Sequence, residues 1–161
     1  MKKLILILIT ISITHFSFSQ KKELKTVEKL IKSNNYTEAI NILESLNDLI
    51  DSADDKTKAK FYYLSGLANY QNGESSFENK LSSIENFNNA KEIEEEGSKI
   101  YSIKIDDILT NLFNSFVNDS RSALENKDYE LSYKSLEAAY NVSKRDTLYL
   151  YNAALVATEA K

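Results

Sequence analysis

The stretch that most constrains the fold is residues 62–73, which read YYLSGLANYQNG. Residues three and four apart are neighbours on a helix, so Tyr63, Leu67 and Tyr70 would share one face. Gly66 lies in the middle of this expected helix, where glycine costs about 1 kcal/mol relative to alanine. We attribute that cost to a second helix that passes too close for a Cβ atom. The stretch therefore predicts a helix that packs tightly against another helix.

Apolar residues recur at helical spacing along the rest of the chain. The 161 residues include no proline and three glycines. This argues against a sandwich or barrel, because such folds need turn residues roughly every 8–12 positions. The expected helices span residues 21–34, 37–50, 56–72, 78–95, 98–126, 129–143 and 147–160. The expected helix caps are Asn35, in a capping box with Glu38, and Gly73, Asp128 and Asp146. We predict an all-α fold of helical hairpins.

The 62–73 stretch resembles the first helix of a tetratricopeptide repeat, which carries an aromatic residue, then leucine and glycine, then tyrosine, in a period of about 34 residues. Residues 36–40 and 128–132 are similar to the start of the second helix of such a repeat. The resemblance implies antiparallel helical hairpins stacked as a short α-solenoid of about seven helices. The hairpins would cover about residues 20–53, 55–96 and 98–144, followed by a final helix at 147–160. The alternative is an irregular helical bundle.

The resemblance also implies small residues where paired helices cross. In the second helices these positions are Ala39, Ser83 and Ser132. The facing positions in the first helices are Val27, Gly66, Ser120 and, in the last helix, Ala154.

Residues 1–19 have the pattern of a secretory signal peptide. Lys2 and Lys3 precede an apolar run at 4–13, and small residues flank position 18. A membrane anchor is the rival reading, but a span needs about 20 apolar residues. The chain has no cysteine to carry a lipid, so we expect the domain 20–161 to be periplasmic or secreted by a bacterium.

Composition argues against nucleic-acid binding and against common catalysis. Without Lys2 and Lys3 the formal net charge falls from −4 to −6, and a phosphate backbone favours a basic patch. The single histidine, His15, lies in the expected signal peptide, so no Ser-His or Cys-His pair can form in the domain. Residues 94–96 are three glutamates, which we expect to form a solvated, fraying helix end and not a metal site. We expect no enzyme, no cofactor and no metal.

In tetratricopeptide proteins, ligands lie along the concave face made by the first helices. The matching residues are Tyr63, Leu67, Tyr70, Gln71 and Arg121. Tyrosine is enriched at interfaces, although the same residues could simply pack the hairpins. The resemblance implies a protein–protein interaction scaffold that binds a protein or peptide partner in the bacterial cell envelope.

The last expected helix is apolar almost all round. It carries Leu148, Tyr149, Tyr151 and Leu155, although the terminal helix of a solenoid needs a polar outer face. It would pack against a second copy, await a partner, or precede a helix that longer relatives carry. We expect self-association, so the alternative function is a structural homo-oligomer.

Overall fold

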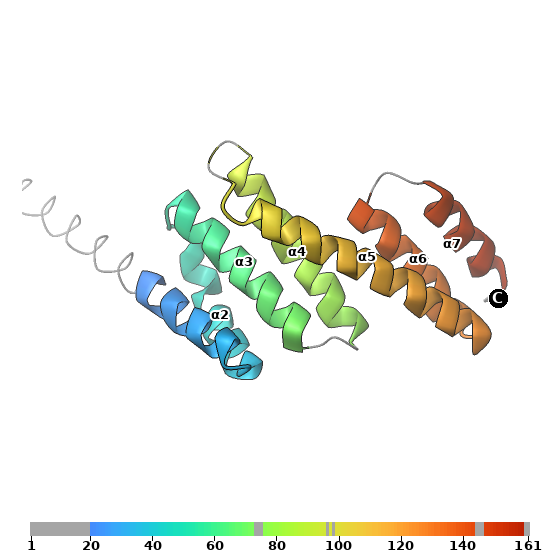
Figure 1. The fold of residues 1–161 in the computed structure, drawn as a ribbon, viewed down its shortest axis with the longest axis horizontal. Coiled ribbons are helices and arrows are strands. Elements are labelled where there is room, and N and C mark those ends of the chain that lie inside the picture. The colour runs from blue at the N-terminus through green and yellow to red at the C-terminus, as the bar shows by residue number, and fades with distance from the viewer. Residues whose placement is uncertain (1–19, 73–75, 96, 98, 144–146, 160–161) are drawn as a thin grey trace, which may run out of the picture. The chain divides into compact units, whose positions relative to one another are not determined.

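The computed structural model describes residues 20–72, 76–95, 97, 99–143 and 147–159. These residues form seven helices and no strand, and the helices pack as sequential adjacent pairs (Figure 1), which confirms the predicted all-α fold class. The first helix covers residues 20–32, and the others are α2 (Tyr36–Ile50), α3 (Asp55–Asn72), α4 (Phe77–Glu94), α5 (Ser102–Glu125), α6 (Tyr129–Ser143) and α7 (Thr147–Glu159). The expected signal peptide 1–19 and the expected caps Gly73 and Asp146 lie outside the described residues.

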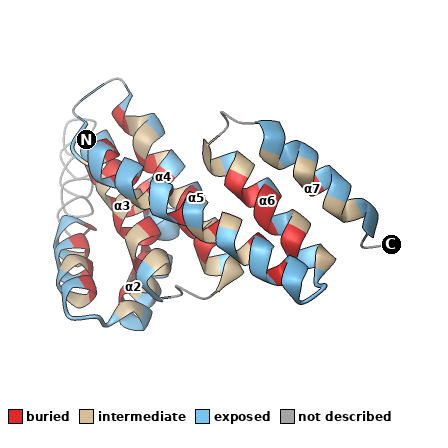
Figure 2. Cartoon of the chain, turned by 45° about the vertical axis from the view of Figure 1, so that its right-hand side comes forward, coloured by how far each residue is buried: buried red, intermediate tan, exposed pale blue. Residues whose placement is uncertain are grey.

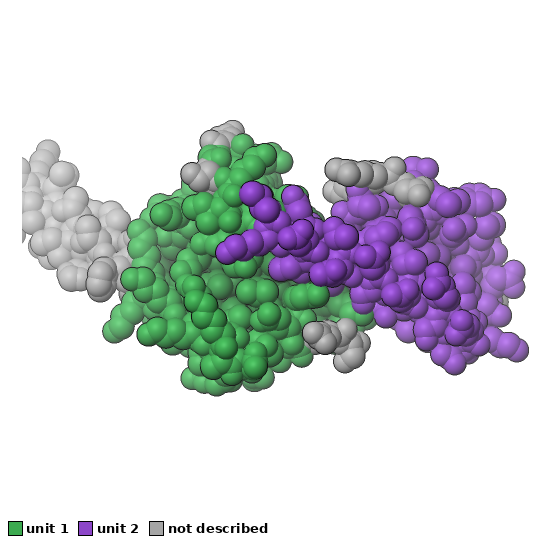
Figure 3. All heavy atoms as spheres, viewed as in Figure 1, with its two compact units in different colours: residues 1–102 green, residues 103–161 purple. Residues whose placement is uncertain are grey.

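The chain divides into two compact units, residues 1–102 and 103–161 (Figure 3). In the first unit α3 packs against both α2 and α4. The buried residues lie where the helices face one another (Figure 2). A core cluster there consists of Leu24, Val27, Ile31, Ala39, Leu43, Leu46, Ile50, Phe61, Leu64 and Ala68. This apolar core joins the first helix, α2 and α3.

The close helix approach predicted at Gly66 is confirmed. A Cβ atom built on Gly66 would lie 2.6 Å from both Cδ1 and Cε1 of Phe87, a fully buried residue of α4. The space at Gly66 is therefore occupied by an aromatic ring. Ser83 of α4 and Ala39 of α2, two of the expected small crossing residues, are also fully buried.

In the second unit α6 packs against α7, and α5 contacts both of these helices. The hydroxyl oxygens of Ser120 and Ser132 lie 2.8 Å apart in a buried hydrogen bond, as expected for facing small residues. The rings of Phe113 and Tyr149 meet edge to face at 5.1 Å.

The prediction that Ala154 lies at a helix crossing is wrong. Ala154 is exposed, and the neighbouring Ala153 is buried in its place. Because α7 is apolar on nearly every side, the sequence pattern does not define which alanine faces inward.

None of the described helices combines the length and apolar character needed to cross a bilayer.

One expected helix cap is confirmed and another is wrong. The Oδ1 atom of Asp128 accepts a hydrogen bond from the backbone N–H of Leu131 at 3.0 Å, as an N-cap should. Asn35 makes no side-chain cap hydrogen bond. Its Nδ2 instead donates to Oε2 of Glu38 at 2.6 Å. The amide therefore binds the carboxylate directly, and the predicted capping box is not formed.

The prediction of a solvated, fraying helix end is wrong at Glu94, the residue at which α4 ends and the connection to α5 begins. Glu94 is buried, and its carboxylate accepts hydrogen bonds at 2.7–3.1 Å from the backbone N–H groups of Ile100, Tyr101 and Ser102 and from the Ser102 hydroxyl. The first N–H groups of a helix have no partner within it and favour negative charge. Glu94 therefore ends α4 and caps the start of α5.

Candidate functional site

The predicted binding face of α3 is largely engaged in packing. The ring of Tyr63 stacks on that of Tyr101, with centroids 4.6 Å apart and planes 20° apart. Leu67 is half-buried against the core cluster. Burial is the main reason why the pKa values of both tyrosines are raised. Tyr70 is half-buried and Gln71 is exposed on the same helix, so this face offers only a small open surface.

The fifth predicted binding residue, Arg121, is exposed on α5 and belongs to the second compact unit. The structure therefore brings Tyr63, Leu67 and Tyr70 together on one face of α3, with Gln71 beside them, and it assigns Arg121 to a separate unit.

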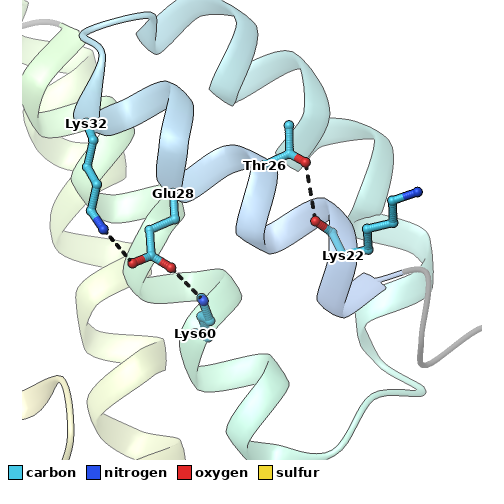
Figure 4. Close-up of polar contacts among 5 residues, drawn as sticks. All are labelled: Lys22, Thr26, Glu28, Lys32 and Lys60. Carbon is cyan, nitrogen blue, oxygen red and sulfur yellow. Dashed lines mark hydrogen bonds and ion pairs between the residues drawn. The ribbon is translucent and has the colours of Figure 1, made fainter.

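Glu28 forms an ion-pair network between the first helix and α3 (Figure 4). Its Oε1 lies 3.1 Å from Nζ of Lys32, and its Oε2 lies 2.8 Å from Nζ of Lys60. The hydrogen bonds from Lys60 and then Lys32 lower the pKa of the carboxyl group to about 2. Figure 4 also shows the Thr26 hydroxyl donating to the Lys22 carbonyl within the first helix. Both carboxylate oxygens of Glu28 are already paired with lysines. The network therefore joins two helices and leaves little negative charge for a ligand to bind.

A polar groove of about 460 Å³ lies across α2, α3 and α4. Because α3 contacts both other helices, it forms the floor, and α2 and α4 form the walls. The lining residues are Ile40, Leu43, Glu44 and Asn47 of α2, Tyr62, Ser65 and Asn69 of α3, and Ser82, Glu85, Asn86 and Asn89 of α4. We call this site the amide groove.

Helical spacing explains why these side chains meet. Each helix contributes residues three, four and seven positions apart, which form one stripe along a helix. Seven positions correspond to about 10.5 Å of helix, so the three stripes run alongside one another for roughly that length. The stripe on the floor, from Tyr62 to Asn69, lies about 150° around the α3 axis from the predicted binding face.

Two of the groove amides are fixed by hydrogen bonds to their own helices. Nδ2 of Asn69 donates to the Ser65 carbonyl at 2.9 Å, and Nδ2 of Asn86 donates to the Ser82 carbonyl at 2.8 Å. One N–H of each amide points back to the backbone, so each side chain keeps its oxygen as an acceptor and its second N–H as a donor.

Ser65 adds an unusual feature to the groove floor. The residue is only 7% exposed, and its hydroxyl has no hydrogen-bond partner among the described residues. Leaving a buried polar group unsatisfied costs about 1–3 kcal/mol. A polar ligand group in the groove is one way to supply the missing partner.

The sequence analysis did not predict the amide groove, because it followed the apolar positions of these helices. The available signal was the spacing of Ser82, Asn86 and Asn89, which places three polar side chains on one face of α4. That spacing indicates a shared face, but it does not indicate that α2 and α3 supply matching stripes. The meeting of the three stripes is a tertiary property.

A larger hollow of about 680 Å³ lies between the start of α3 and the end of α4. Its lining includes Asp55, Lys56, Glu92 and Glu95 together with Glu94, whose carboxylate already caps α5. Across the part of the chain that the structure describes, no group of three or more histidine, cysteine, aspartate or glutamate side chains could hold a metal ion.

The predicted oligomer residues on α7 fall into two groups. Leu148, Tyr151 and Leu155 are 56%, 62% and 49% exposed. Tyr149 is half-buried against Phe113 of α5. The structure therefore places three of the four on the open side of α7.

Fold and groove together define the class: an all-α protein built from consecutive helix pairs, with a polar groove across three helices of one compact unit. Comparison of the chain with protein-family models, with curated proteins and with solved structures finds no significant match. The case for a function therefore depends on the geometry of this molecule.

Proposed function

We propose that the chain is an exported scaffold that binds a protein or peptide partner in the bacterial cell envelope, and that its helix pairs are degenerate tetratricopeptide repeats. The repeat assignment is supported by the burial of expected small residues such as Ala39, Ser83 and Ser132. Export is supported by the signal-like pattern of residues 1–19.

The observation that carries the binding role is the amide groove. It gathers asparagine side chains from α2, α3 and α4 into one surface feature of about 460 Å³. An amide side chain offers both a donor and an acceptor, and so does the backbone of a peptide. We propose binding without catalysis, because the lining residues that the structure describes include no histidine or cysteine to form a nucleophilic pair.

The test is a cross-linked pull-down from envelope extract with the wild type and two neighbouring variants. Asn89→Lys places a long side chain in the groove, whereas Asn88→Lys changes an exposed residue of α4 outside the groove lining. We expect one reproducible heterologous protein with the wild type and with Asn88→Lys, and its loss with Asn89→Lys. Far-ultraviolet circular dichroism and a thermal melt verify that both variants fold.

Two results would overturn the proposal. Absence of any heterologous partner would contradict a scaffold function. A partner retained equally by Asn89→Lys and Asn88→Lys would move the binding site away from the amide groove, and the open part of the α3 face, at Tyr70 and Gln71, would be tested next.

A structural homo-oligomer is the second candidate function, and the exposed apolar face of α7 favours it. Leu150, Tyr151 and Leu155 are 43%, 62% and 49% exposed, and no charged residue occurs from Thr147 to Thr158. A neutral apolar face can pair with a copy of itself without charge repulsion, as a two-fold interface requires.

A further inference from the structure

The amide groove carries two carboxylates that have no counter-ion in the part of the chain that the structure describes. Glu44 lines it from α2 and Glu85 lines it from α4, so the two acidic side chains belong to opposite walls. Both residues are exposed, and neither forms an ion pair among the described residues. No lysine or arginine occurs among the described lining residues. The groove therefore has a local charge of −2 with no basic group of its own.

The uncharged groups of the groove also favour a ligand that donates hydrogen bonds. Asn69 and Asn86 each use one Nδ2 hydrogen within their own helix and keep the side-chain oxygen as an acceptor. The buried hydroxyl of Ser65 has no hydrogen-bond partner among the described residues. Lysine ammonium and arginine guanidinium groups are donors only, with three and five N–H groups respectively. The free amide oxygens can accept hydrogen bonds from such a cation, and the charge of the two carboxylates favours it.

The size of the groove restricts the ligand to a short segment. The lining stripes run for about 10.5 Å, which corresponds to about three residues of extended chain at roughly 3.4 Å per residue. Asn47 and Asn89 on opposite walls offer amides to the backbone of such a segment. We propose that the amide groove binds an extended peptide segment with a central lysine or arginine, whose cationic group lies between Glu44 and Glu85.

This inference rests on the proposed function and narrows it to basic segments. The chain as a whole has a formal net charge of −4, so long-range attraction favours the same class of partner. Hydrogen bonds between cationic donors and carboxylates are roughly twice as strong as neutral ones. Charge-assisted contacts on both walls would distinguish a basic segment from a neutral segment of similar length.

The experiment selects random linear peptides displayed on phage against the purified protein, with counter-selection on the Asn89→Lys variant to discard peptides that bind elsewhere. Enriched peptides are synthesised and their dissociation constants are measured by fluorescence polarisation. We expect each to contain lysine or arginine and to bind about tenfold more weakly when that residue is glutamine. We also expect affinity to fall as ionic strength rises.

The matched variants are Glu44→Gln with Glu85→Gln, and Glu125→Gln with Glu137→Gln. Each pair removes two exposed carboxylates with little change in shape, the first inside the groove and the second on α5 and α6. We expect the first pair to weaken binding of a selected peptide about tenfold and the second pair to leave it unchanged.

The outcomes separate this inference from the proposed function. Enrichment of neutral or acidic peptides that lose binding in Asn89→Lys would overturn the charge preference and leave a peptide-binding groove. Equal binding by both double variants would likewise contradict a role for Glu44 and Glu85. Failure to enrich any peptide that depends on the groove would contradict both proposals.

Discussion

At the residue scale, Gly66 shows how one missing side chain sets a helix contact. Position 66 is in the middle of α3, where alanine would favour the helix by about 1 kcal/mol. The Phe87 ring occupies the volume that an alanine Cβ would need. Phe87 is itself fully buried, so the ring has no open space to move into.

We expect Gly66→Ala to lower the free energy of unfolding by about 1–3 kcal/mol, because overpacking outweighs the gain in helix propensity. Gly66→Leu should cost more. Gly97→Ala is the matched control, since a Cβ at Gly97 would meet nothing within 4 Å. Urea unfolding of the three variants is the measurement, and equal or higher stability of Gly66→Ala would show that the α3–α4 contact relaxes freely.

Glu94 is the second residue whose effect can be measured by itself. Its buried carboxylate accepts hydrogen bonds from three backbone N–H groups at the start of α5. We expect Glu94→Ala to destabilise the protein by about 2–3 kcal/mol, because it leaves these donors without their partner. Glu95→Ala, one residue further and exposed, should cost little. Thermal melts in which the two variants lose the same stability would contradict a capping role for Glu94.

The pH dependence of the Glu94 contribution has a definite sign. Burial acts to raise the pKa of this carboxyl group, but hydrogen bonds from the Ser102 side chain and from the backbone outweigh it, so the folded-state pKa is lowered. A lowered folded-state pKa stabilises the fold above the unfolded-state pKa, and the benefit is lost as pH falls through the folded-state value. The difference in the free energy of unfolding between the wild type and Glu94→Gln should therefore become smaller as the pH falls.

At the scale of elements, the first helix is joined to α3 by the Glu28 network in addition to the apolar core. The folded-state pKa of Glu28 is about 2, against an ordinary value of 4.5. The contribution of Glu28 to the free energy of unfolding should be complete above about pH 4.5 and should disappear as the pH falls towards 2. The carboxylate is 40% exposed, so solvent screening limits the contribution to at most about 1 kcal/mol.

We therefore expect Glu28→Gln to be less stable than the wild type at neutral pH by at most about 1 kcal/mol, with the difference shrinking in acid. Chemical denaturation over a pH series is the measurement. Glu125→Gln, which removes an exposed carboxylate on α5, is the control and should show no such trend. A difference that is constant across the series would mean that the ion pairs do not contribute to stability.

At the scale of the whole molecule, the open question is whether α7 joins two copies of the chain. We expect wild-type protein to sediment as a dimer, and Leu155→Glu to raise the dissociation constant more than about tenfold by placing a charge in the apolar face. Leu124→Glu is the control, because Leu124 is a similarly exposed leucine on α5. Analytical ultracentrifugation that finds a monomer at high micromolar concentration would rule out the homo-oligomer.

The helices and several of their contacts follow from local pattern. Apolar spacing predicted all seven helices, including α6 at its observed bounds, and Gly66 indicated a close neighbour. Local pattern failed at Ala154, because an almost wholly apolar helix has no preferred inner face. It failed at Asn35, because an amide can donate to a side chain as readily as it can accept from the backbone.

Only the tertiary structure decided what the polar residues do. Asn69 and Asn86 are 17 positions apart in the sequence, and nothing in either helix indicates that α3 and α4 bring them into one groove. Glu94 was expected to be solvated because its own helix offers it no partner, and the partner is the start of the next helix. Helical periodicity is a local property that the sequence contains, whereas a groove or a shared cap depends on which helices meet.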